Sequence, residues 1–148
     1  RLANSLTQGR VTEVNKIKDW DPSFSVGHPL MDEQHRKLLS LFQLATECMA
    51  DATHEGVAQF HLILNDLAAY VRTHFQTEEA LLQRCNYPLL DAQQAEHLAY
   101  EARLTDLLFS ATTGVCDKTT LCEQLGNWWT HHILHSDMQY RDHVQGHY

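Results

Sequence analysis

Residues 60–85 read FHLILNDLAAYVRTHFQTEEALLQRC, and apolar side chains recur in this stretch every three or four positions. Such a period places one stripe of side chains along a single face of a helix. The stripe consists of Phe60, Leu64, Leu67, Val71, His74, Glu78, Leu81 and Cys85. Two ionisable residues, His74 and Glu78, therefore lie on the face that should be buried. The stretch predicts a long amphipathic helix whose core-facing side carries groups that need a partner.

The helix that contains residues 60–85 ends at Asn86-Tyr87-Pro88, because proline disfavours helical geometry at the preceding residue. Three other segments of the chain show the same helical period. Four long helices with short connections predict an all-α, up-down-up-down antiparallel four-helix bundle. Turn-forming residues before the first helix predict an N-terminal arm. Residues 1–17 are expected to be a linker or the tail of an upstream region, and residues 20–30 form the arm. The four helices are expected at residues 31–51, 56–85, 91–112 and 118–144. The bundle domain is expected to span residues 18–148.

Composition narrows the classes of partner. The 148 residues suit one domain, and a net charge of −8 disfavours a nucleic-acid partner. No apolar run is long enough for a membrane span, so no membrane contact is expected from this domain. The four cysteines form no C-x-x-C pair, which favours a reducing, cytoplasmic setting. Because the chain begins with Arg1, we expect it to be processed or cut from a longer protein.

Every predicted helix carries a histidine on its inward stripe, and two helices carry a glutamate four residues later. These residues are His35, His74, His97, His132, Glu78 and Glu101. Burying six such groups without partners would exceed the roughly 5–15 kcal/mol stability of a domain, so a multivalent cation is expected among them. No cysteine lies beside the histidines, which disfavours zinc, and imidazoles with carboxylates inside a bundle favour iron. The Glu-x-x-His and H-E-x-x-H motifs of other metalloproteins are absent.

Five motifs together resemble the hemerythrin family, specifically bacterial hemerythrin-like domains. They are DWDPSFSVG (19–27), MDEQHRKL (31–38), HFQTE (74–78), EHLAYE (96–101) and NWWTHHILHSDMQYR (127–141). The resemblance runs from about Trp20 to the end of the chain. It implies two non-haem iron ions, bridged by an oxo or hydroxo group and by carboxylates, that bind O2 between four antiparallel helices.

The resemblance also implies a role for individual residues. By this resemblance, His35 and His74 are terminal ligands of the iron with an open position. His97 and His132 are terminal ligands of the second iron. Glu78 and Asp137 are the carboxylates that bridge the two irons. Only the resemblance selects Asp137, because its five-residue step from His132 turns about 140° on an ideal helix.

One position departs from the family pattern. Where the family has a second histidine four residues after the first in the third helix, this chain has Glu101. A third carboxylate would make the centre more negative and favour the ferric state, so we predict a lower reduction potential and rapid autoxidation. Alternatively, Glu101 bridges the irons, occupies the open position, or points away and is replaced by water. Its neighbour Tyr100 is expected at the surface or at an interface, about 100° around the helix.

The resemblance implies an O2 pocket lined by apolar residues next to the ligands. The same apolar residues could equally be ordinary members of the core. They are Leu38, Phe75, Trp129 and Ile133, with Trp128 behind them. No catalytic residue is assigned, since no separate acid–base pair accompanies the proposed site.

Three functions remain open. The leading expectation is the sensory domain of a larger bacterial signalling protein, which detects O2, nitric oxide or redox poise and signals to a covalently linked output domain. The alternatives are a free-standing O2 storage or carrier protein, and a di-iron enzyme of the peroxidase or oxidase type that acts on peroxide or nitric oxide.

Overall fold

The computed structural model describes residues 19–49, 51–113 and 118–146, so the predicted linker at 1–17 lies outside the described residues. These ranges contain helices and no strand, which confirms the all-α class. The elements are η1 (Pro22–Phe24, a 3-10 turn), α1 (Pro29–Met49), α2 (His54–Arg84), α3 (Leu90–Thr113), α4 (Lys118–His131), η2 (His132–Asp137, a π-helix) and α5 (Met138–Gln145). The predicted helix limits differ from these by at most two residues at each end.

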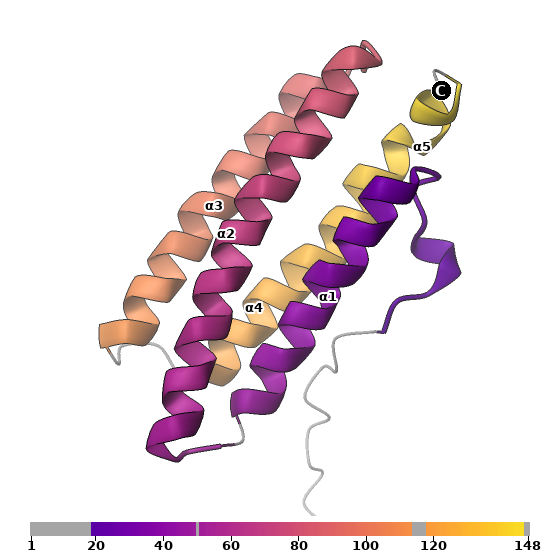
Figure 1. Cartoon of the computed structure of the whole chain (residues 1–148). Helices are drawn as coiled ribbons and strands as arrows, with labels where there is room; N and C mark the ends of the chain where they lie inside the picture. Colours follow the sequence, from indigo (N-terminus) through magenta and orange to yellow (C-terminus); the bar gives the residue numbers. More distant parts are fainter. Residues whose placement is uncertain (1–18, 50, 114–117, 147–148) are drawn as a thin grey trace, which may run out of the picture.

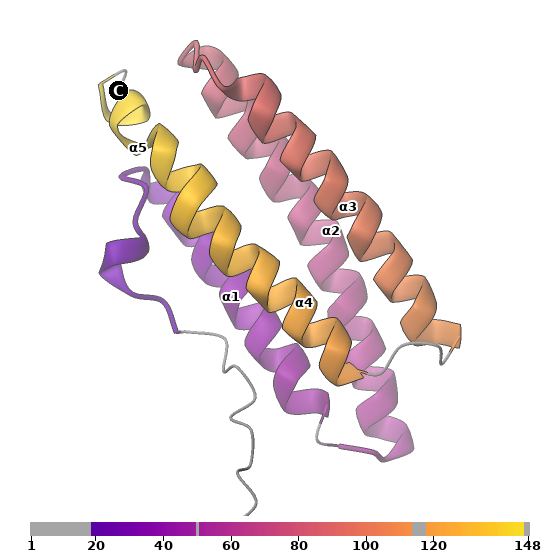
Figure 2. The same ribbon diagram turned by 180° about the vertical axis from the view of Figure 1, so that it is seen from behind.

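The predicted antiparallel bundle is confirmed. Successive helices run in opposite directions, with α2 beside α1 and α3, and α4 also contacting both α1 and α3 (Figures 1 and 2). The predicted fourth helix continues without a break from α4 through η2 into α5. In the described part of the chain, no helix has the length and apolar character that crossing a bilayer requires.

The arm is fixed to the beginning of α1 by Asp32. Its Oδ1 accepts a hydrogen bond from the backbone N–H of Val26 at 2.9 Å, and its Oδ2 accepts one from the hydroxyl of Ser25 at 2.5 Å. A carboxylate in the first turn of a helix also interacts favourably with the helix dipole. The arm therefore has a defined position one turn before His35.

Two apolar clusters make up the core of the described part of the chain, and a polar layer separates them. Along α1, Met31 belongs to the smaller cluster and Leu38 to the larger one. Along α2, Phe75 belongs to the larger cluster and Leu81 to the smaller one. Because ionisable residues lie between these positions on both helices, the four helices enclose a layer of buried polar groups.

Candidate metal centre

The layer between the clusters contains six of the seven side chains predicted as ligands. Each is at most 2% exposed, and they are His35, His74, Glu78, His97, His132 and Asp137. Their ligand atoms form two groups in which all members lie within 4.8 Å of one another. The first group consists of His35, His74, Glu78 and Asp137, and the second of Glu78, His97 and His132.

Glu78, on α2, belongs to both groups because its two carboxylate oxygens face different histidines. Its Oε2 lies 3.6 Å from Nε2 of His35 and 3.4 Å from Nε2 of His74. Its Oε1 lies 3.0 Å from Nε2 of His97. This arrangement would allow the carboxylate to bridge two metal ions.

Asp137 divides its oxygens in the same way. Oδ2 lies 3.2 Å from Nε2 of His35, in the first group, whereas Oδ1 lies 3.0 Å from Nε2 of His132, in the second. The π-helix η2 begins at His132 and ends at Asp137. Because a π-helix pairs residues five apart, it brings together two side chains that an α-helix would separate. Short π-helical insertions of this kind occur frequently at functional sites.

Three of the four histidines are oriented by a hydrogen bond at Nδ1, the ring nitrogen that faces away from the layer. The pairs are His74 with Gln34 Oε1 at 2.7 Å, His97 with Glu79 Oε1 at 3.1 Å, and His132 with Glu96 Oε2 at 2.9 Å. An ionised carboxylate or an amide oxygen only accepts, so each Nδ1 carries the hydrogen, and the neutral form of each ring would direct the lone pair of Nε2 inward. Such outer partners orient the ligands of metal sites.

Replacing Glu96 by alanine is expected to weaken metal binding by about 10- to 100-fold, because His132 loses the acceptor that fixes its ring. The fold should survive, since the Glu96 side chain is 46% exposed. A metal titration monitored by absorption measures the effect. Asp106→Ala, at another exposed acidic position on α3, is the control and should leave the affinity unchanged. Equal affinities in the two variants would contradict the role given to Glu96.

The layer leaves several polar atoms without the partner that burial requires. Nε2 of His35, Nε2 of His74, Oε1 of Glu78 and Oδ2 of Asp137 are buried and have no hydrogen-bond partner among the residues that the structure describes. Leaving buried polar atoms unpaired is costly, and a metal ion bound by the deprotonated rings and the carboxylates would be a partner for all four atoms.

In the second group, the ring nitrogens of two histidines also require a positively charged partner between them. Nε2 of His97 and Nε2 of His132 lie 3.2 Å apart. With Nδ1 protonated in both neutral rings, two lone pairs face each other, so a proton or a metal ion must lie between them. These residues fit a metal pair with mixed imidazole and carboxylate ligands.

The charges within the layer are strongly coupled. Burial acts to raise the pKa of Glu78, but its contacts with the four histidines outweigh burial and hold the pKa well below its usual range. Burial acts to lower the pKa of His35, but Asp137 and Glu78 outweigh it and raise the pKa to about 9. Burial dominates at His74 and lowers its pKa. The layer therefore keeps Glu78 ionised, as a metal ligand must be.

Glu101 is the one predicted ligand that the structure leaves outside both groups. Over residues 90–110 of α3 the buried positions are Gln93, His97, Tyr100 and Leu104, whereas Glu101 is only half-buried. The expectation that Tyr100 lies at the surface or at an interface is wrong, because its side chain is buried inside the bundle and only 1% exposed. Its ring stacks on that of Trp128, with the centroids 3.7 Å apart. Tyr100 therefore occupies the inward position of this turn, and Glu101 lies beside it.

The predicted pocket residues surround the histidines. Phe75 stacks on His97 with ring centroids 3.8 Å apart, and Trp128 stacks on His132 at 4.5 Å. Trp129 meets the ring of His35 edge-on at 5.7 Å. Four of the five residues are buried, while Trp128 is half-buried; the buried ones are Leu38, Phe75, Trp129 and Ile133. The histidines are thus enclosed by apolar groups on this side.

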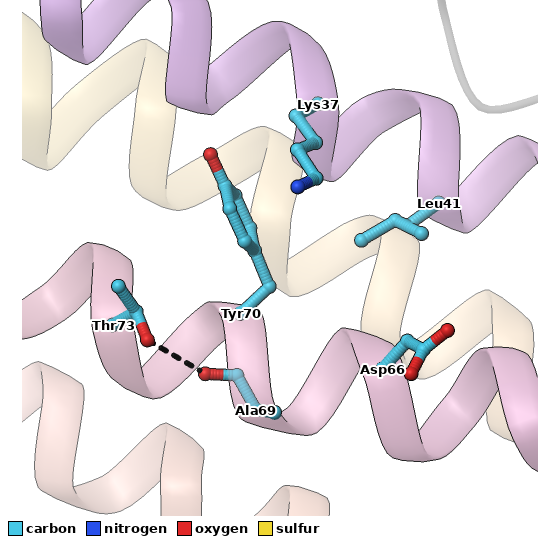
Figure 3. A pocket seen from close by; sticks show the side chains of 6 residues that line it. All are labelled: Lys37, Leu41, Asp66, Ala69, Tyr70 and Thr73. Atoms are coloured by element: carbon cyan, nitrogen blue, oxygen red, sulfur yellow. Dashed lines mark hydrogen bonds between the residues drawn. The ribbon is translucent and has the colours of Figure 1, made fainter.

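A separate hollow of about 300 Å³ lies on the outer side of α1 and α2 (Figure 3). In it, Nζ of Lys37 lies 4.3 Å from the centre of the Tyr70 ring. Its other lining residues are Leu41, Asp66, Ala69 and Thr73. No predicted site residue lines this hollow, so the candidate centre is the enclosed layer.

Comparison with known proteins agrees with this geometry. The chain is 25% identical to a bacteriohemerythrin of Stenotrophomonas maltophilia over 130 residues, which cover 86% of this chain and 82% of that protein. It is 28% identical to a hemerythrin-like protein of Naegleria gruberi over 123 residues, and these cover 83% of this chain and 90% of that protein. It is 27% identical to myohemerythrin-1 of Phascolopsis gouldii over 122 residues, with coverages of 82% and 90%.

A solved structure of a hemerythrin variant has the same fold, with a TM-score of 0.79 and 21% identity over 87% of this chain and 98% of that one. A family model described as the hemerythrin HHE cation binding domain matches residues 26–143. The match takes in the whole polar layer and all four helices that surround it. The chain therefore belongs to the hemerythrin HHE cation-binding family.

Proposed function

We propose that this protein holds two non-haem iron ions in the two donor groups and binds O2 at the centre they form. The observation that carries the proposal is the division of Glu78 and Asp137, each of which directs one oxygen to each pair of histidines. The iron pair, when bound, would supply the electrons that reduced iron can share with O2. The residues of the chain hold the metals, exclude water and fix the charge of the site.

Water exclusion is the task of the apolar residues around the histidines. Leu38, Trp129 and Ile133 are each at most 2% exposed, and Phe75 covers one face of the His97 ring. A dry pocket slows the loss of reduced oxygen species to solvent. We therefore assign the O2 pocket to this side of the layer.

We further propose that the protein is a sensory domain whose output depends on this centre. The hydroxyl of Tyr140 on α5 donates a hydrogen bond to Oε2 of Glu78 at 3.0 Å. Tyr140 belongs to the same apolar cluster as Val26 of the arm and Met31 at the beginning of α1. A change at Glu78 thus has a direct packing route to the arm, which is the route a linked signalling domain would need.

A free-standing O2 carrier is the second candidate. The relatives favour it, because the chain covers 80–90% of their length and they contain little beyond this domain. Stopped-flow mixing of the reduced, iron-loaded protein with O2 separates the two. An oxygenated spectrum that lasts many minutes supports the carrier, immediate conversion to the ferric spectrum supports the redox sensor, and failure to take up iron contradicts both.

Rapid autoxidation is part of the sensor proposal, and we assign the bias to the charge of Glu101. This carboxylate lies one helical turn from His97 and is only half-buried, so it acts through space on the second metal position. Glu101→Gln removes the charge and is expected to slow autoxidation about two- to fivefold. The rate of ferric product formation in air-saturated buffer measures it. An unchanged rate would remove Glu101 from the redox behaviour.

A further inference from the structure

Gln93 is a buried polar residue of α3 that the sequence did not single out. Its side chain is 4% exposed, and its Oε1 is buried without a hydrogen-bond partner among the described residues. Its Nε2 donates to the backbone oxygen of Ser136 at 2.9 Å and lies 3.4 Å from Oδ1 of Asp137. An uncharged amide thus lies against the polar layer with an acceptor oxygen to spare.

The position of Gln93 relates it to the second donor group. It precedes His97 by four residues, so both side chains project from the same face of α3, one turn apart. The Asp137 oxygen that it contacts is Oδ1, which faces His132 rather than His35. Gln93 therefore lies beside the second metal position and away from the first.

We propose that Gln93 is the third side chain of the second metal position and offers its amide oxygen as a neutral ligand. The inference rests on the proposed function, because it requires a metal in the second group. It changes the comparison with the family. The family has two histidine ligands four residues apart on its third helix. In this chain those two positions are then Gln93 and His97, not His97 and Glu101. The residue that departs from the family pattern is therefore a glutamine at position 93.

The chemistry of the amide sets the expected behaviour. An amide oxygen carries no charge and binds a divalent first-row metal more weakly than imidazole does. Without Gln93, each metal position has two histidines and the two shared carboxylates. With it, the second position gains one weak ligand, so we expect the second metal to bind less tightly and to exchange faster than a third histidine would permit.

Anaerobic titration with Co(II), followed by its visible absorption, tests this assignment in the full chain. Gln93→His should tighten the second binding step at least about tenfold, and Gln93→Leu should weaken it by a similar factor. Gln94→His places an imidazole at the next, half-buried position of α3 and serves as the matched control, which should leave both steps unchanged. Circular dichroism of each metal-free variant verifies the fold, and Gln93→Glu, which should also tighten the second step, replaces Gln93→His if that variant does not fold.

Two results would overturn the proposal. One is an affinity for the second Co(II) ion that none of the Gln93 variants changes. The other is a second step that Glu101→His tightens and Gln93→His does not, which would return the third position to Glu101. In both cases the two-metal centre itself stands. Absence of any Co(II) binding by the unmodified protein would instead refute the centre and Gln93 together.

Discussion

Glu78→Gln is expected to reduce the iron content of the reconstituted protein from two ions per chain to one or none. Glu78 is the residue common to both donor groups, and its two oxygens face different histidines. An amide keeps the size of the side chain and one acceptor oxygen but loses the charge and the second acceptor. Both metal positions lose a ligand in a single substitution, so the affinity should fall by more than the roughly 10- to 100-fold typical of outer partners.

The measurement is iron per chain after anaerobic loading and desalting, together with the near-ultraviolet absorption of the ferric centre. Glu79→Gln is the matched control at the next residue. Glu79 accepts a hydrogen bond from Nδ1 of His97 at 3.1 Å, and an amide oxygen can accept the same bond. The control should keep two ions. Two tightly held ions in Glu78→Gln would contradict the bridging role.

The sequence predicted the fold and most of the layer because one physical rule governs both. Inward positions recur at helical spacing, so His74 and Glu78 had to face the core once the apolar residues around them did. Asp137 does not follow that rule. It reaches the layer only because residues 132–137 form a π-helix, and periodicity read with an α-helical step cannot detect this change of pitch.

The inward stripe predicted for the third helix is right at His97 and wrong at Glu101, for a different reason. Its exposed side carries apolar residues, since Leu98 is 68% exposed and Phe109 is 71% exposed. The contrast between its two faces is therefore weak, and a stripe through Glu101 looked as good as the true one through Gln93 and Tyr100. The expected surface or interface position of Tyr100 followed from placing Glu101 inward, about 100° around the helix, but the Tyr100 ring packs against Trp128 inside the bundle.

The outer partners of the histidines could not be recognised from sequence alone. Glu79 directly follows Glu78, and Glu96 directly precedes His97. Both resemble ordinary acidic residues on a solvated helix, and the Glu96 side chain is indeed 46% exposed. Their role depends on which ring nitrogen of a histidine on another helix faces them, so only the packed structure reveals it.

Removing the metals from the iron-loaded protein with a chelator is expected to lower its melting temperature by about 8–16 °C. A ligand held a thousandfold above its dissociation constant stabilises the folded state by about 4 kcal/mol. In a domain of this size each kcal/mol shifts the midpoint by roughly 2–4 °C. The metals should stabilise the fold because the stripped layer keeps Glu78 and Asp137 buried. In that state a proton must replace the metal between Nε2 of His97 and Nε2 of His132, which lie 3.2 Å apart.

Thermal unfolding by circular dichroism, with and without chelator, measures this difference, and adding iron back should restore the original midpoint. Glu78→Gln provides the internal control: a protein that no longer holds two metals has less to lose, so chelator should shift its midpoint by only a few degrees. Identical midpoints for the loaded and stripped wild-type protein would mean that the six buried groups compensate one another without a cation. The helices would then enclose a hydrogen-bonded polar core, and neither iron nor O2 binding would follow from its geometry.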